Sequence, residues 1–251
     1  MNQNEHIKEE WDAAASSWSA FIRKGKDYYR DELNNPATFK LIGEVRGQRV
    51  LDVSCGEGYN TRILARKGAK VTGVDFSEKL IDLAKQEEAK EELGISYSVL
   101  DAADLNKEFS SNNFDLVTCF MALQDIKHYN KVISEVARVL KQRGRFIFSI
   151  PHPCFSKIVV NGTKISTTTR YFGAVTHPIH WDMERLDKPF NTTAFHRTLT
   201  DYFEVLHKSK LFVARLVEPR PTQEGLRKHP PLREVLVIPQ SIIIEAVKIN
   251  Q

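Results

Sequence analysis

The stretch Val50-Leu-Asp-Val-Ser-Cys-Gly-Glu-Gly58, followed by Val74-Asp75, decides the fold of this chain. An apolar run that ends in a glycine-containing turn and leads into a helical pattern indicates a strand–turn–helix unit. Gly56 and Gly58 allow the backbone to approach a ligand closely, and Asp75, at the end of the next apolar run, can accept both hydroxyls of a ribose. The stretch therefore predicts a nucleotide-binding arrangement.

The residues around this stretch alternate between short apolar runs and helical patterns. Strands are predicted at residues 50–53, 70–75, 95–100, 114–120 and 145–150. The helix between the second and third strands begins after Ser77 and is predicted to end at Gly94, and another helix covers 130–141. Strands that alternate with helices at this spacing predict a doubly wound α/β fold with a parallel sheet. The near-continuous apolar run at 117–121 agrees, because both faces of a parallel sheet are covered.

The pattern changes after Pro151. Residues 151–197 are rich in His, Thr, Pro and aromatic residues and have no clear period, so we expect a lid or an inserted subdomain without regular structure. Thr198 and Asp201 form a predicted capping box for a helix. Strands are predicted at 211–217 and 241–247, with a proline-rich loop at 218–231.

These patterns divide the chain into four parts. They are an N-terminal helical cap (1–47), an α/β core (48–150), a lid insert (151–197) and a C-terminal helix with two antiparallel strands that complete the sheet (198–251). The length of 251 residues fits one such domain with insertions.

Composition narrows the class of protein. The net charge is only +4 and the densest basic run is Arg227-Lys228, which disfavours nucleic acid as a partner. Cys55, Cys119 and Cys154 lie far apart without a C-x-x-C pair, which favours a reducing compartment and disfavours a metal site. The first residues are polar, and the apolar runs are too short to cross a bilayer. We therefore expect a cytoplasmic protein that does not span a membrane.

The turn also indicates which nucleotide it binds. A dinucleotide site needs a third glycine, but Thr61 stands at that position, and no basic residue lies in the turn. Asp52 would repel a pyrophosphate but suits a ligand that carries an ammonium group. These features disfavour an NAD-dependent oxidoreductase. They favour S-adenosylmethionine, which has an ammonium group and ribose hydroxyls but no phosphate.

The segment from Gln48 to Ile150 resembles the class I S-adenosylmethionine-dependent methyltransferases, in particular the ubiquinone/menaquinone-methyltransferase-like superfamily. Asp52, Gly56 and Gly58 match the pattern D-x-G-x-G-x-G of motif I in that family. Four further matches follow in the family's order: Asp75, Asp101-Ala102, Phe114-Asp115 and Arg138-Val-Leu-Lys-x-x-Gly144. Ser54 departs from the pattern, because it replaces the first glycine, and this puts the cofactor affinity in doubt. The resemblance implies a seven-stranded, mostly parallel, Rossmann-like sheet.

The resemblance also implies roles for matching residues, with S-adenosylmethionine as cofactor and S-adenosylhomocysteine as product. Asp52 would engage the amino group of the methionine part, and Asp75 the ribose. The cofactor would contact further residues along its length: Ser54, Cys55, Gly56 and Gly58 at the methionine tail, Phe76 on the adenine face, Asp101 and Ala102 at the adenine edge, and Met121 near the sulfonium. Instead of contacting a cofactor, Phe76 and Met121 could simply pack in the core, and Asp75 could cap a helix.

Candidates for an acceptor site come from loops that the fold places over the carboxyl ends of the strands. His152 is the preferred proton-moving group because it lies just past a strand, and His128 is the second. Further substrate-binding candidates are Trp11, Trp18, Tyr28, Tyr29, Phe155, Trp181 and His196. Solvated loop histidines, and an N-terminal helix that only packs on the sheet edge, remain the alternatives.

The favoured function is methyl transfer to nitrogen, oxygen or carbon of a small aromatic or heterocyclic metabolite by an in-line displacement. Tyr28-Tyr-Arg-Asp31 and His152-Pro-Cys-Phe155 are similar to small-molecule methyltransferases, including those of azapteridine natural-product pathways. A tRNA-modifying methyltransferase and a non-catalytic S-adenosylmethionine-binding module are the alternatives. We expect a monomer or a homodimer.

Overall fold

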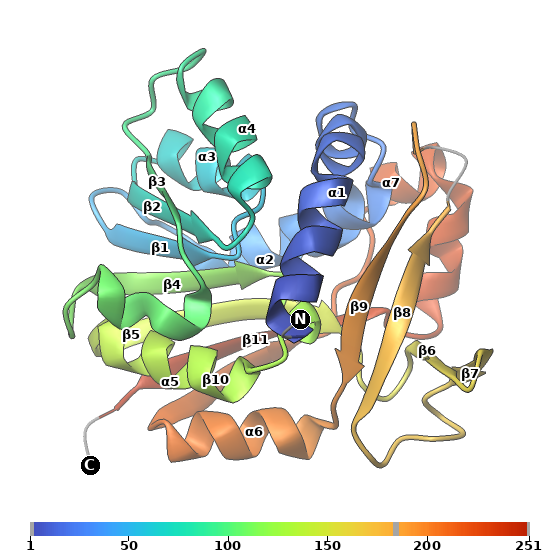
Figure 1. Ribbon diagram of the computed structural model, residues 1–251. Helices are drawn as coiled ribbons and strands as arrows, with labels where there is room; N and C mark the ends of the chain where they lie inside the picture. Colours follow the sequence, from blue (N-terminus) through green and yellow to red (C-terminus); the bar gives the residue numbers. More distant parts are fainter. Residues whose placement is uncertain (1–2, 183–185, 250–251) are drawn as a thin grey trace.

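The central element is a seven-stranded sheet with the strand order β10-β11-β5-β4-β1-β2-β3. The computed structural model describes residues 3–182 and 186–249. Within this sheet only β11 runs antiparallel to its neighbours β5 and β10 (Figure 1). The strands are β1 (Arg49–Val53), β2 (Lys70–Asp75), β3 (Ser96–Val99), β4 (Phe114–Phe120), β5 (Leu140–Pro151), β10 (Leu211–Val217) and β11 (Ser241–Lys248). The doubly wound, mostly parallel sheet is confirmed.

The middle of the sheet holds the site in place because its strands are buried. β1 pairs with β2 on one side and with β4 on the other, and four of its five residues are buried. The buried run of β4 explains its near-continuous apolar sequence, since helices cover both faces. The strand order reverses between β1 and β4, and a reversal of this kind opens a crevice at the carboxyl ends of these strands.

Helices cover both faces of the sheet (Figure 1). On one face α5 and α6 pack on a core that includes Phe146, Phe148 and Tyr202, and on the other α2, α3 and α4 pack around Leu64, Ile81 and Ile147. The helices are α1 (Gln3–Arg23), η1 (Arg30–Asn34), α2 (Asn35–Ile42), α3 (Tyr59–Arg66), α4 (Glu78–Glu88), η2 (Ala102–Lys107), η3 (Leu123–Asp125), α5 (Tyr129–Val139), α6 (Leu199–Lys208), α7 (Gln223–Lys228) and η4 (Pro230–Leu236).

Two predicted helix starts are confirmed. The Ser77 hydroxyl accepts a hydrogen bond from Leu80 N at the start of α4, and Thr198 and Asp201 form a reciprocal capping box at the start of α6. The predicted end of α4 at Gly94 is wrong, because the helix ends at Glu88. The segment after Ala84 is dominated by charged residues, so no apolar face keeps the next turns against the sheet.

The expectation that residues 151–197 lack regular structure is also wrong. They form two β-hairpins, β6 (Lys157–Val160) with β7 (Thr163–Ser166) and β8 (Val175–Trp181) with β9 (Phe190–His196). In β9 buried residues alternate with more exposed ones, but the buried positions hold Thr, Ala and His, which hides the period of two in the sequence. β9 packs against α1, so this hairpin lies beside the N-terminal helix (Figure 1).

The predicted loop at 218–231 instead carries α7 and the beginning of η4. Thr222 caps α7 by accepting a hydrogen bond from Gly225 N. Residues 1–2 of the predicted cap, 183–185 of the predicted lid and 250–251 of the predicted C-terminal part lie outside the described residues. Within the described ranges, none of the helices has the length and apolar character that a membrane span requires.

Candidate cofactor and acceptor site

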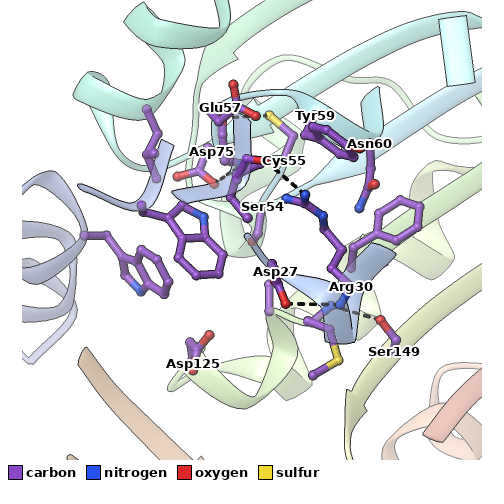
Figure 2. A pocket seen from close by; sticks show the side chains of 18 of the residues that line it. Asp27, Arg30, Ser54, Cys55, Glu57, Tyr59, Asn60, Asp75, Asp125 and Ser149 are labelled. Carbon is purple, nitrogen blue, oxygen red and sulfur yellow. Dashed lines mark hydrogen bonds between the residues drawn. The ribbon is translucent and has the colours of Figure 1, made fainter. Parts of the chain in front are cut away.

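A cavity of about 360 Å³ lies where the carboxyl ends of β1, β2 and β4 meet. Its floor is the turn after β1, from Ser54 to Glu57, together with Asp75 and Met121. Residues of α1, η1 and β8 close the other sides (Figure 2). The cavity therefore occupies the crevice that the strand order predicts for a ligand.

The turn after β1 has an unusual backbone. Ser54 and Gly56 have φ angles of +55° and +57°, in the left-handed region, and Gly58 has +78°. Gly56 N donates a hydrogen bond of 2.9 Å to Asp75 Oδ2, which ties the turn to the end of β2. A Cβ at Gly58 would lie 2.3 Å from Tyr97 Oη, so this position has no room for a side chain. Ser54 adopts the conformation that glycine favours, at a cost of about 1 kcal/mol.

Asp52 is a buried carboxylate directly below the turn. Its two oxygens accept hydrogen bonds from the hydroxyls of Thr61 (2.7 Å) and Thr118 (2.8 Å). Burial raises the pKa of Asp52 to about 7, and the nearby Asp75 adds to the rise, while the two hydroxyls oppose it. No cation of the described residues forms an ion pair with it. A ligand ammonium group would supply the missing positive charge.

Asp75 ends β2 at the opposite edge of the turn. Its oxygens accept hydrogen bonds of 2.9 Å from Ser77 N and Gly56 N. Burial raises the pKa of Asp75 to about 6, and these backbone bonds counteract the rise. Asp75 therefore does anchor the helix start, and its carboxylate also borders the cavity.

Arg30 brings a cation into the cavity from a distant part of the sequence. It lies on η1, its guanidinium carbon lies 3.9 Å from the centre of the Tyr59 ring, and its Nε donates to Asp31. Its Nη1 is buried and has no hydrogen-bond partner among the described residues. A buried, unpaired guanidinium nitrogen suits an anionic group of a ligand. The sequence around Arg30 did not indicate this role, because Arg30 lies far from the turn after β1 in the chain and only folding brings the two together.

Aromatic rings form the wall opposite the turn. Trp11, Trp18 and Phe21 of α1 border the cavity together with Trp181 of β8. The rings of Trp18 and Trp181 meet edge to face with centroids 5.2 Å apart, and Phe190 stacks on Trp181. Such a wall favours a flat or apolar group.

The structure brings many of the predicted site residues together. Those that border the cavity are Asp52, Ser54, Cys55, Gly56, Asp75, Phe76, Met121, Trp11, Trp18, Tyr29 and Trp181. Asp101 and Ala102 border a small adjoining hollow, which they share with Ser54 and Phe76. Residues around the cavity that sequence reasoning missed include Asp27, Arg30, Asn60, Gln124 and Asp125.

Other predicted residues lie elsewhere within the described part of the chain. His152 is buried, its Nε2 lies 3.0 Å from Glu218 Oε1, and it does not border the cavity. His128 precedes α5, and Phe155 is 41% exposed. His196 Nε2 pairs with the Tyr171 carbonyl at 2.8 Å. Tyr28 stacks on His229. The geometry therefore offers no support for either histidine as the proton-moving group.

Comparison with known proteins identifies the family. A methyltransferase domain model matches residues 51–148. The chain is 38% identical over 120 residues to a ubiquinone biosynthesis O-methyltransferase of Coxiella burnetii, covering 47% of this chain and 50% of that protein. It is 29% identical over 210 residues to a demethylmenaquinone methyltransferase of Clavibacter sepedonicus, covering 76% and 84%. The matched domain, these relatives and the fold support a class I S-adenosylmethionine-dependent methyltransferase.

The fold of this methyltransferase is also similar to solved structures. An S-adenosylmethionine-dependent methyltransferase from Mesorhizobium loti matches with a TM-score of 0.68 and 26% identity, covering 84% of this chain and 96% of that one. The chain spans about half the length of the curated relatives that match it with 38% identity. The cofactor of the family is S-adenosylmethionine. The orphaned Nη1 of Arg30 and the uncompensated Asp52 fit its carboxylate and ammonium groups.

Proposed function

We propose that this methyltransferase transfers the methyl group of S-adenosylmethionine to a small aromatic or heterocyclic acceptor. The observation that carries the proposal is the single cavity that joins a motif I turn, two buried carboxylates and a wall of tryptophans. When bound, the cofactor supplies an electrophilic methyl group. The chain itself would bind, orient and shield the two reactants.

The proposed cofactor contacts follow the charges in the cavity. Asp52 would attract the ammonium group, because it has no cationic partner among the described residues. Arg30 Nη1 would donate to the carboxylate, because this atom is buried and has no hydrogen-bond partner among them. Asp75 would accept the ribose hydroxyls at the other end of the turn, and the hollow bordered by Phe76, Asp101 and Ala102 would receive the adenine.

The acceptor would lie against the aromatic wall of Trp11, Trp18 and Trp181. Stacking between rings would hold a flat acceptor and exclude water from the reacting atoms. One relative is named for ubiquinone biosynthesis and the other for demethylmenaquinone, so a ring of the quinone or phenol type is a fitting acceptor class. Alignment of the acceptor with the methyl group would then account for most of the protein's contribution.

The experiment that tests the proposal follows a labelled methyl group. The purified protein is incubated with methyl-tritiated S-adenosylmethionine and a cell extract divided into small molecules, RNA and protein. We expect label in the small-molecule fraction, and none with Asp75→Ala. Label in RNA would instead support the tRNA-modifying alternative. Binding of S-adenosylhomocysteine without transfer to any fraction would favour the non-catalytic module.

A further inference from the structure

Asp125 is a buried carboxylate beside the cavity that the proposed cofactor contacts leave unused. It ends η3, the short helix that follows β4, and is 9% exposed. It borders both the main cavity and the adjoining hollow. Figure 2 shows it on the side of the cavity away from Tyr59 and Asn60.

The hydrogen bonds of Asp125 leave part of it unsatisfied. Gln124 Nε2 donates to Asp125 Oδ2 (3.0 Å) and to the Met121 carbonyl (2.6 Å), which fixes the carboxylate relative to the end of β4. Asp125 Oδ1 and Gln124 Oε1 are buried and have no partner among the described residues. Both atoms accept hydrogen bonds. A ligand that satisfies them must therefore donate.

Among the described residues, none forms an ion pair with this carboxylate. Arg197 donates its hydrogen bonds to the carbonyls of Leu123, Ile126 and Lys127 rather than to Asp125. Burial raises the pKa of Asp125 well above its usual range, Glu10 of α1 adds to the rise, and Arg197 and Gln124 oppose it. A carboxylate with a raised pKa takes up a proton more readily near neutral pH.

We propose that Asp125 receives the proton of the acceptor, which is an aromatic compound with a ring O–H or N–H. This inference rests on the proposed function. The acceptor's oxygen or nitrogen forms a bond to the methyl carbon, the bond from that carbon to sulfur breaks with its electron pair left on sulfur, and the acceptor's proton passes to Asp125. The carboxylic acid then returns this proton to solvent as the product leaves.

Binding of coloured probes in the presence of S-adenosylhomocysteine tests the inference without turnover. The O–H probe is 4-nitrocatechol, and its dimethyl ether lacks the donor. The N–H probe is 5-nitrobenzimidazole, and its N-methyl derivative lacks the donor. At least one donor probe should bind about tenfold more tightly than its methylated partner, the difference that a hydrogen bond to a charged group typically makes. Which pair shows the preference distinguishes O–H from N–H acceptors.

Substitution then assigns the preference to a residue. Asp125→Asn keeps an acceptor oxygen but removes the charge, so it should reduce the preference to about threefold or less while the affinity for the methylated probe stays the same. Asp27→Asn is the matched control, because Asp27 borders the same cavity but accepts a hydrogen bond from Arg30 N. This variant should keep the donor preference.

Several outcomes would overturn the inference. Equal binding of donor and methylated probes by the unsubstituted protein refutes it without any variant, so it stays testable even if Asp125→Asn does not fold. Retention of the preference by Asp125→Asn, or its loss in Asp27→Asn as well, also refutes it. If S-adenosylhomocysteine itself does not bind, the proposed function fails. If it binds normally and only the donor preference is absent, the assignment of Asp125 alone fails.

Discussion

Ser54 and Met121 hold left-handed backbone conformations on two sides of the cavity, with φ angles of +55° and +49°. Residues other than glycine rarely adopt this region, and such strain persists where the surrounding structure enforces it. Here the Cys55 N to Val74 carbonyl bond holds one turn, and bonds from Met121 N to Ser149 hold the other. The strained residues therefore lie where backbone atoms border the proposed ligands.

The raised pKa of Asp52 predicts how cofactor binding depends on pH. Burial raises this pKa to about 7, so the carboxyl is neutral below that pH and cannot attract an ammonium group. The affinity for S-adenosylhomocysteine should fall about tenfold from pH 8 to pH 6, as linkage requires for a pKa of about 7. Calorimetric titration across this range measures the effect. Asp52→Asn should bind weakly at pH 8 and lack most of the dependence between pH 6 and pH 8; an unchanged profile would contradict this role.

The unpaired Nη1 of Arg30 predicts a selective loss of affinity. Arg30→Gln should weaken binding of S-adenosylhomocysteine about tenfold or more, because a hydrogen bond to a charged carboxylate is lost. Binding of methylthioadenosine should hardly change, since it lacks the amino-acid part. Asp75→Ala is the matched comparison and should weaken both ligands. If Arg30→Gln affects the two ligands equally, the guanidinium does not contact the carboxylate.

At the scale of single elements, the residues that cap the start of α6 define where this helix begins. α6 begins with a complete capping box, in which Asp201 Oδ2 accepts from Thr198 N (2.7 Å) and the Thr198 side chain accepts from Asp201 N (3.2 Å). The buried Tyr202 and Leu206 then hold the helix on the sheet. The cap and the buried side chains together hold the start of α6, and so they position Arg197, which directly precedes the cap. Arg197 donates a hydrogen bond to the Leu123 carbonyl in the short helix that carries Asp125.

Loss of this cap should destabilise the whole domain. Thr198→Ala should lower the free energy of unfolding by about 1 kcal/mol, the usual cost of losing an N-cap side chain. Urea denaturation followed by circular dichroism measures the change. Thr200→Ala is the control, because Thr200 is exposed two residues after the cap and should change stability by less than about 0.5 kcal/mol. Equal effects of the two substitutions would show that the cap is unimportant.

At the scale of the whole molecule, the cavity is closed by segments far apart in the chain. Glu10 of α1 accepts hydrogen bonds from Thr193 N (2.8 Å) and Thr193 Oγ1 (3.0 Å) of β9, and Ser17 donates to the Lys188 carbonyl. These contacts tie the N-terminal helix to the β8–β9 hairpin over the core (Figure 1). The parts predicted as cap and lid therefore form one joint cover.

A joint cover predicts joint protection when ligand binds. S-adenosylhomocysteine should slow amide hydrogen exchange in α1 and in β8–β9 together, by up to about 100-fold at a concentration near 100 Kd. The amides of α6, outside the cavity, should change less. Hydrogen exchange read by mass spectrometry resolves these segments. Protection of α1 without the hairpin would mean that the two do not close the site as a unit.

The sequence by itself determined the sheet and the side of the cavity where we propose that the cofactor binds. Strand predictions at 70–75 and 114–120 match the observed bounds, because strands buried inside a parallel sheet must be largely apolar. The prediction at 211–217 also matches, although only Leu211 of that strand is buried. Asp52, Gly56 and Asp75 are close in the chain and follow from the local geometry of one strand–turn–helix unit and its neighbour. Local signals of this kind need no knowledge of the rest of the molecule.

Only the tertiary structure decided which residues from distant parts of the chain complete the cavity. Arg30 and Asp125 reach the cavity from a helix ahead of the core and a turn after β4, and no pattern in the chain links them. His152 seemed suited to the site because it follows a strand, yet its ring is buried beside Glu218. The physical reason is that side-chain direction and pairing depend on contacts between distant segments, which sequence spacing does not encode.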